Sequence, residues 1–195
     1  AAELRFAGAL GNSGEPGETL VSFAGPTASG MGLVLDDANT LWDRGGAKQL
    51  NRYGLDGRLL ASFELPESAE RNDQMTRAGD QLLFKLKRVI HALPLNAVPG
   101  MKPQRLPGEA EVMSSNALDG KVVILEKEEL FWLDAVTGAR TALMKPGVRL
   151  QALVLGEDGT IHGFGEGKVF AWKDGQLLQG FPKGFTGERP QKIGK

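Results

Sequence analysis

The sequence repeats at a period of about forty residues, and each repeat holds several short apolar segments, two tight turns and a closing proline. The first turns of the four repeats are Asp37–Asn39, Ala78–Asp80, Leu118–Gly120 and Glu157–Gly159, and the closing prolines are Pro66, Pro107, Pro146 and Pro182. Four strand-length segments in each repeat, without a helical period over ten residues, indicate β-sheets arranged radially around an axis.

This pattern predicts an all-β, β-propeller-like fold with about four four-stranded blades. The predicted blades together span 31–182, at about 31–66, 75–107, 112–146 and 148–182. Residues 1–30 hold two further strand candidates, which could close the ring or pair with a partner. Residues 183–195 are interpreted as the start of a further blade. Four blades and a partial fifth would leave an open sheet edge, so we expect further blades from another chain or from a longer form of this one.

The turns carry the residues that β-hairpins require. Asp56-Gly57 is a strong hairpin signal, because glycine accepts the positive φ of a two-residue turn. We expect positive φ at Gly57 and Gly138. The second repeat holds four prolines between Pro94 and Pro107, which predicts an edge strand or a loop, because proline cannot donate to a sheet. The three tryptophans, with Phe131 and Phe170, are expected to fill the space between sheets.

Composition excludes several classes of function. The 195 residues carry 23 basic and 24 acidic side chains, so no strong overall charge attracts nucleic acid or an anionic membrane. No cysteine is present, which excludes disulfides, thiolate metal sites and a cysteine nucleophile. No apolar run approaches the ~20 residues of a membrane-spanning helix. The chain begins Ala-Ala-Glu, which fits cleavage after a small-residue signal site and favours a secreted or periplasmic protein, although a shortened chain would look the same.

Two segments resemble repeats of known propellers. The segment from Leu33 to Leu60, with Asp-x-Asn before Leu41-Trp42 and Tyr53-Gly-Leu-Asp-Gly after it, looks like a blade of NHL-repeat and lactonase-like proteins. Leu133 to Arg140 looks like the Leu-Asp-Ala-x-Thr-Gly turn of quinoprotein repeats. That motif carries a tryptophan where this chain has Leu143, and no other repeat contains Ala-x-Thr-Gly, which argues against a complete quinoprotein ring. The resemblance implies a β-propeller of the extracellular or periplasmic kind.

Candidate metal ligands are few. His91 and His162 cannot form the three-histidine set of a catalytic metal site. Asp36, Asp37 and Asn39 form the densest group of oxygen ligands and would suit calcium. The same residues are also typical of a β-turn, where their side chains bond the local backbone. We therefore assign neither a metal nor a cofactor.

Catalytic motifs are also missing. Ser29 and Ser114 lack the Gly-x-Ser-x-Gly elbow of serine hydrolases. The glycine-rich stretch Gly163 to Gly167 is followed by a predicted strand, whereas a dinucleotide site requires a helix there, so we interpret it as a hairpin loop. No residue is assigned a catalytic role.

Charged loops are the candidate partner-binding surface. The basic run Lys85-Leu86-Lys87-Arg88 and the acidic run Glu126 to Glu129 both lie between the second and third strands of their predicted blades. Loops at this position emerge on one face of the disc, where opposite charges could bind a partner, pair with each other or remain solvated. The candidate partner-binding residues are Arg44, Arg71, Lys85, Lys87, Arg88 and Glu128.

These features favour a non-enzymatic β-propeller module for binding or assembly, as part of a larger propeller or a multi-chain complex. Its partner would be a protein, either another chain or further blades, and neither nucleic acid nor a membrane. The alternative is a portion of a lactonase-like or quinoprotein-like enzyme whose site is completed by blades that this chain lacks.

Overall fold

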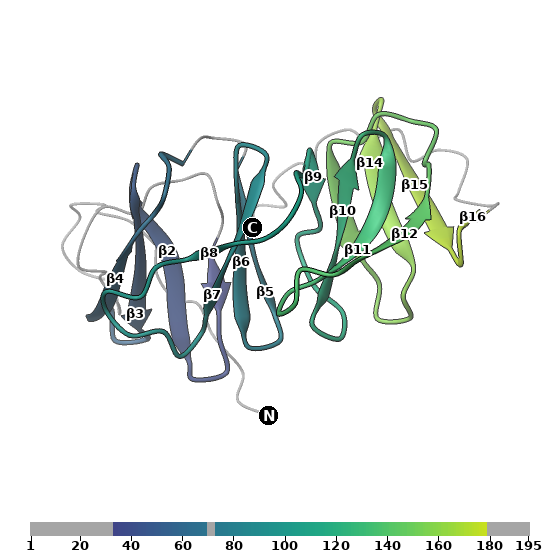
Figure 1. Ribbon diagram of the computed structural model, residues 1–195. Helices are drawn as coiled ribbons and strands as arrows, with labels where there is room; N and C mark the ends of the chain where they lie inside the picture. The colour runs from purple at the N-terminus through teal and green to yellow at the C-terminus, as the bar shows by residue number, and fades with distance from the viewer. Residues whose placement is uncertain (1–32, 70–72, 179–195) are drawn as a thin grey trace.

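A computed structural model describes residues 33–69 and 73–178 of the protein, and these ranges contain sixteen short strands (Figure 1). They form four antiparallel sheets of four strands each, and the described residues contain no helix. The prediction of an all-β fold with four four-stranded blades is therefore confirmed. The predicted strand candidates in residues 1–30 and the partial blade at 183–195 lie outside the described residues.

Each sheet is formed by four consecutive strands, so each blade is one continuous stretch of chain. Blade 1 contains β1 (Val34–Leu35), β2 (Thr40–Gly46), β3 (Gln49–Gly54) and β4 (Leu59–Glu64). Blade 2 contains β5 (Gln74–Ala78), β6 (Gln81–Leu86), β7 (Val89–Pro94) and β8 (Gln104–Arg105). Blade 3 contains β9 (Val112–Met113), β10 (Lys121–Glu126), β11 (Glu129–Asp134) and β12 (Arg140–Met144). Blade 4 contains β13 (Ala152–Leu155), β14 (Ile161–Gly165), β15 (Lys168–Lys173) and β16 (Gln176–Leu177).

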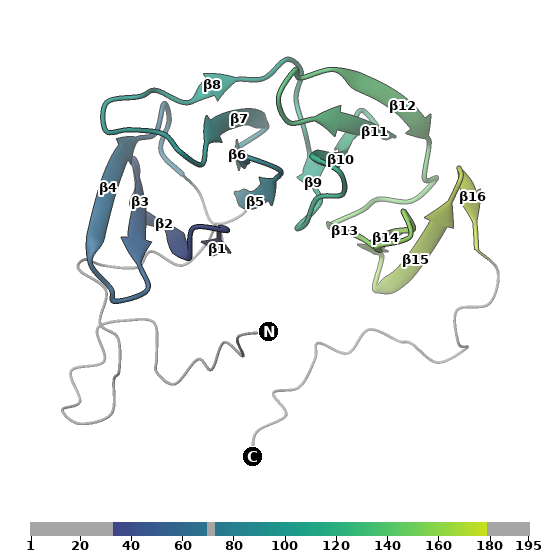
Figure 2. The ribbon, with the colours of Figure 1, turned by 90° about the horizontal axis from the view of Figure 1, so that it is seen from below.

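The four blades follow one another along an arc that the described residues do not close into a ring (Figure 2). The first strand of each blade lies on the inside of the arc and the fourth lies on the outside. The inner strands of neighbouring blades contact each other, β1 against β5 and β9 against β13. This radial order is the geometry of a β-propeller.

Three apolar cores lie between consecutive blades. Side chains alternate between the two faces of a strand, so each blade sends one set of residues toward the blade before it and the other set toward the blade after it. Trp42, Leu50 and Phe63 of blade 1 pack against Leu82 and Phe84 of blade 2. The second core joins blades 2 and 3, and the third joins blades 3 and 4. Trp42 and Trp172 are buried and Trp132, Phe131 and Phe170 pack against these cores, which confirms their predicted place between the sheets.

Polar side chains tie the inner strands together at intervals of 39 residues, about one repeat. The Gln74 Oε1 atom accepts a hydrogen bond from the backbone N–H of Met113 at 2.8 Å. Asn116 accepts from the N–H of Leu155 and donates to the carbonyl oxygen of the same residue, both at 2.7 Å. Each tie satisfies backbone groups of the next blade, which fixes the position of one blade against the next.

Two inner strands differ from the sequence interpretation. β5 and β9 were not predicted as strands, because Gln-Met-Thr-Arg-Ala lacks an apolar alternation and Val112–Met113 is only two residues long. The proline-rich segment contains β8, an outer strand of two residues, as expected for an edge. Gly57 and Gly138 have φ values of 79° and 70°, which confirms the positive φ predicted for both.

Candidate partner-binding site

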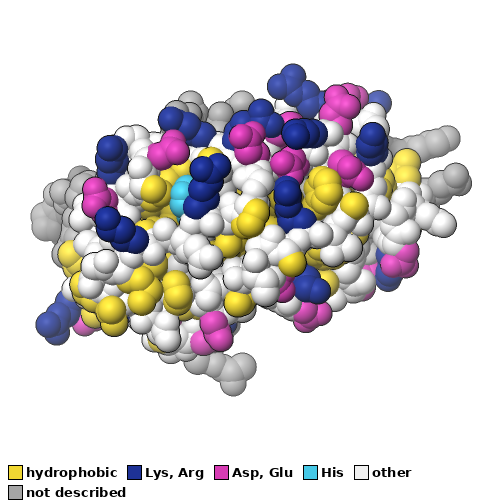
Figure 3. All heavy atoms as spheres, viewed as in Figure 1, with side chains coloured by type: hydrophobic (Ala, Val, Ile, Leu, Met, Phe, Trp, Pro, Cys, Tyr) yellow, Lys and Arg dark blue, Asp and Glu magenta, His cyan; other side chains and the backbone are white. Residues whose placement is uncertain are grey.

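The turns between the second and third strands of the four blades lie on one edge of the arc. They contain residues 47–48, 87–88, 127–128 and 166–167. Figure 3 shows acidic and basic side chains gathered along the upper edge of the molecule, where these turns lie in Figure 1. This charged edge is the surface that the two charged runs predict.

The basic run of blade 2 makes contacts within the protein itself. Lys85 is only 3% exposed, and its Nζ atom donates a hydrogen bond to the carbonyl oxygen of Lys87 at 2.9 Å. The Nζ atom of Lys87 lies 3.3 Å from the Glu67 carboxylate, in the linker between blades 1 and 2. Lys85 therefore lies in the interior, and Lys87 joins two neighbouring blades.

Arg88 makes the same kind of connection one junction later. Its guanidinium lies 3.4 Å from the Glu109 carboxylate and 2.9 Å from Glu111, both in the linker between blades 2 and 3. The candidate Arg44 lies in β2 and is half-buried, with its Nε and Nη1 atoms buried and without a hydrogen-bond partner. The candidate Arg71 lies outside the described residues.

Glu128 lines an open cleft between blades 3 and 4. The cleft has a volume of about 550 Å³ and receives side chains from the β10–β11 turn, the β14–β15 turn and the linker from β12 to β13. Two buried or half-buried apolar residues, Leu125 and Val148, line it together with charged residues. The charged lining residues are Glu111, Glu128, Lys145, Arg149 and Glu166.

The linker from β12 to β13 forms one wall of the cleft, and it is held in place where it meets β13. The N–H of Gln151 donates to the carbonyl oxygen of Phe164 in β14 at 2.7 Å. Gly165 follows in the same strand, and a Cβ atom at this position would overlap the backbone of Arg149. A glycine is therefore required where β14 meets the linker. This close approach makes the wall a fixed part of the fold.

Sequence reasoning identified Glu128 but missed Lys145, Arg149 and Glu166. These three are isolated charges in the sequence, and the fold brings them to one cleft from separate turns and a linker. All four are exposed, and among the ion pairs of residues 33–69 and 73–178 none involves them. Aligning the sequence of each linker with that of the linker one repeat earlier could have identified them.

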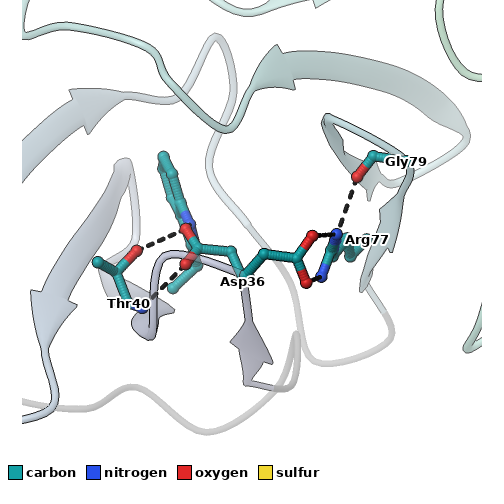
Figure 4. A network of polar contacts seen from close by, with 6 residues as sticks. Asp36, Thr40, Arg77 and Gly79 are labelled. Atoms are coloured by element: carbon teal, nitrogen blue, oxygen red, sulfur yellow. Dashed lines mark hydrogen bonds and ion pairs between the residues drawn. The ribbon is translucent and has the colours of Figure 1, made fainter.

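The predicted oxygen cluster in blade 1 is a structural turn (Figure 4). Asp36 accepts hydrogen bonds from the N–H and hydroxyl of Thr40 and, at 2.9 Å, from the indole N–H of Trp42. Burial alone would raise the pKa of Asp36, but the bonds from Thr40 and Trp42 outweigh it and lower the pKa. Asp37 pairs with Arg77 of β5. Since both carboxylates already have partners, the arrangement supports the β-turn interpretation over a calcium site.

The remaining candidates also have structural surroundings. His91 is 4% exposed and stacks on Phe84, and burial lowers its pKa. The hydroxyl of Ser114, fully buried, donates to the carbonyl oxygen of Asn116 and accepts from the N–H of Val123. Ser29 lies outside the described residues. Within the described ranges, no three histidine or acidic side chains gather as metal ligands, and no long apolar helix suited to crossing a membrane is present.

The fold resembles solved β-propellers at low sequence identity. The computationally designed protein Ika8 matches with a TM-score of 0.61 and 15% identity, over 85% of this chain and 54% of that one. The WD40 repeats of RRP9 match with a TM-score of 0.59 and 12% identity, over 80% of this chain and 52% of that one. The β-propeller domain of Cps50 (Swd1) from Myceliophteria thermophila matches with a TM-score of 0.52 and 12% identity, over 72% and 50% of the two chains.

These matches establish a propeller-repeat likeness, and the chain spans about half the length of each propeller that it matches. No protein-family model and no curated relative matches the sequence.

Proposed function

We propose that this chain is a non-enzymatic β-propeller module that assembles with further blades, supplied by another chain or by the rest of a longer one. The observation that carries the proposal is an apolar sheet face on blade 4, called here the uncovered face because its residues join none of the three cores formed by the described residues. Each of the three internal junctions buries the corresponding face of the preceding blade. On blade 4 the corresponding face is the one that points away from blade 3.

The uncovered face follows from the strand register of blade 4. Leu153, Ile161 and Trp172 point toward blade 3, where they join the third core. The residues that alternate with them therefore point away from it. In the paired parts of β13–β15 they are Ala152, Val154, His162, Phe164, Val169 and Ala171, and all but His162 are apolar. Val154 is 46% exposed and Ala152 is also exposed, whereas Phe164 and Val169 are half-buried and Ala171 is buried. A partly exposed apolar sheet face of this kind is typical of an interaction surface.

The opposite end of the arc differs. On the face of blade 1 that points away from blade 2, Leu41 and Tyr53 are 4% and 0% exposed, and Asp43 and Asn51 beside them are also buried. The two ends of the arc are therefore not equivalent, and blade 4 offers the surface for assembly. Since a propeller protects its sheet edges and faces by radial repetition, a further blade is the expected occupant.

Light scattering of the purified chain, measured at micromolar concentration after gel filtration, tests the proposal. We expect a mass above the 20.9 kDa of one chain, because the apolar face associates when no further blade covers it. Val154→Glu should move the mass toward 20.9 kDa. Val136→Glu is the matched control, because Val136 is 68% exposed in the β11–β12 turn, away from the face. A wild-type monomer whose solubility and mass match those of both variants would contradict the proposal.

Two finer points remain predictions. An NHL-like or quinoprotein-like repeat type rests on the sequence resemblance alone. A secreted or periplasmic location likewise stays a prediction, and fractionation of the source cells with an antibody against the chain would test it.

A further inference from the structure

The third blade junction is built differently from the first two. At the first junction, the N–H of Ala69 in the linker donates to the carbonyl oxygen of Ala47 in the β2–β3 turn at 2.7 Å. At the second junction, the N–H of Ala110 donates to the carbonyl oxygen of Arg88 in the β6–β7 turn, also at 2.7 Å. Among the described residues, no backbone hydrogen bond joins the linker of the third junction to the β10–β11 turn.

Ion pairs also join the linkers of the first two junctions to a turn, in both cases the β6–β7 turn of blade 2. Lys87 pairs with Glu67 at the first junction, and Arg88 pairs with Glu109 at the second, where the linker meets the turn of the preceding blade. Glu128 occupies the turn position of Arg88, and Arg149 lies three residues before β13, as Glu109 lies three residues before β9. The two charges are therefore exchanged at the third junction, yet these residues form no ion pair there within the described structure. The cleft of about 550 Å³ occupies the place of the missing contacts.

We propose that this cleft binds an extended peptide segment of a protein partner that carries both an acidic and a basic side chain. The backbone of the segment would occupy the gap between turn and linker, where the other two junctions make a hydrogen bond. Its acidic side chain would meet Lys145 and Arg149, and its basic side chain would meet Glu128 and Glu166.

The composition of the cleft favours such a peptide over a ligand of one charge. Carboxylates and cations both line it, so a purely anionic or cationic ligand would meet repulsion from part of the wall. Leu125 and Val148 add an apolar surface against which the segment can pack. The fixed linker means that little ordering is needed on binding, which favours affinity.

The proposal goes beyond ring assembly, because the cleft lies between blades 3 and 4 and not on the uncovered face. Fluorescence anisotropy with three labelled ten-residue alanine-based peptides tests it. The first alternates glutamate and lysine at every second position, the second carries glutamate alone at those positions, and the third carries lysine alone. We expect the mixed peptide to bind at least about tenfold more tightly than either of the others, since each loses one set of contacts and gains repulsion.

A double variant provides the decisive comparison. Lys145→Glu with Arg149→Glu replaces the two cations that would meet the acidic side chain of the peptide, so every charged residue that lines the cleft becomes acidic. We expect this variant to retain its melting temperature and to bind the mixed peptide about tenfold or more weakly. Lys102→Glu with Lys121→Glu, the same charge change at two exposed lysines that do not line the cleft, is the control and should bind like the wild type.

Equal binding of the three peptides, or unchanged binding by the Lys145→Glu, Arg149→Glu variant, would overturn the proposal. Val154→Glu separates it from the proposed function. This variant should lose assembly and still bind the mixed peptide, whereas a failure of assembly in the wild type would leave the peptide result unaffected.

Discussion

The guanidinium of Arg77 in β5 forms a two-point ion pair with the carboxylate of Asp37, forty residues earlier in the β1–β2 turn (Figure 4). The pair joins the inner strands of blades 1 and 2. The neighbouring Asp36 is buried and accepts the indole N–H of Trp42 in the core between the same blades. Two adjacent carboxylates therefore support one junction, one at the surface and one in the interior.

These two carboxylates should differ in their contribution to stability. Arg77→Ala removes a pair whose Asp37 side chain is 81% exposed, so we expect a loss of less than about 1 kcal/mol. Asp36→Ala leaves the buried indole N–H of Trp42 and the groups of Thr40 without their acceptor, so we expect a loss of about 2–3 kcal/mol. Urea unfolding of both variants measures the difference. Equal losses would show that the surface pair is as important as the buried network.

Gly138 should be less tolerant of substitution than Gly167. Both have positive φ, so a change to alanine costs about 1 kcal/mol at either site. A Cβ at Gly138 would also lie 2.7 Å from the Pro107 side chain, whereas a Cβ at Gly167 meets nothing within 4 Å. We expect Gly138→Ala to lower the free energy of unfolding by about 1 kcal/mol more than Gly167→Ala, because of overpacking. Equal effects in urea unfolding would mean that the blade 3 turn does not pack on Pro107.

Asp43 should make stability depend on pH. Burial raises the pKa of Asp43 to about 6, well above the ordinary value of an aspartate. The folded state therefore prefers the protonated carboxyl, so this contribution to stability is present below pH 4 and is lost as the pH rises through 6. We expect Asp43→Asn to match the wild type near pH 4 and to be more stable at pH 8, by roughly 1–3 kcal/mol.

Urea unfolding between pH 4 and pH 8 measures this difference. Asp119→Asn, the same substitution at an exposed turn, is the control. A constant difference between Asp43→Asn and the wild type across this range would show that Asp43 is not buried as a carboxyl group.

Asn116 should hold blades 3 and 4 together. Its amide bonds both backbone groups of Leu155, so Asn116→Ala removes two hydrogen bonds across the junction and should cost about 1–3 kcal/mol. Hydrogen exchange provides a local readout, and the Leu155 amide should lose more protection than the Val123 amide within blade 3. Equal loss of protection at both amides would contradict this role of Asn116, because blades 3 and 4 would then be opening together.

The strands and turns that the sequence predicted correctly depend on local signals. Alternating apolar residues and turn pairs such as Asp56-Gly57 specify hairpins without reference to distant residues. β5 escaped prediction because it lacks an apolar alternation. It is a strand through its pairing with β6, and the side chains of Gln74 and Thr76 bond Met113 and Ser115 in the next blade. Similarly, Lys85 looked like a surface residue in a basic run, and only the packing of blade 2 shows that it is buried.

The four described blades, their four-stranded plan and the edge on which the charged turns lie could be predicted from the sequence, because they follow from the period, the alternation and the turn residues. Which charges pair between blades and which remain in a cleft could not, because this depends on tertiary packing. Arg88 and Glu128 occupy equivalent turn positions, but Arg88 meets Glu109 and Glu111 while Glu128 faces an open junction. The physical reason is that an ion pair depends on how closely a turn approaches the next linker, and that distance is set by the packing of whole blades.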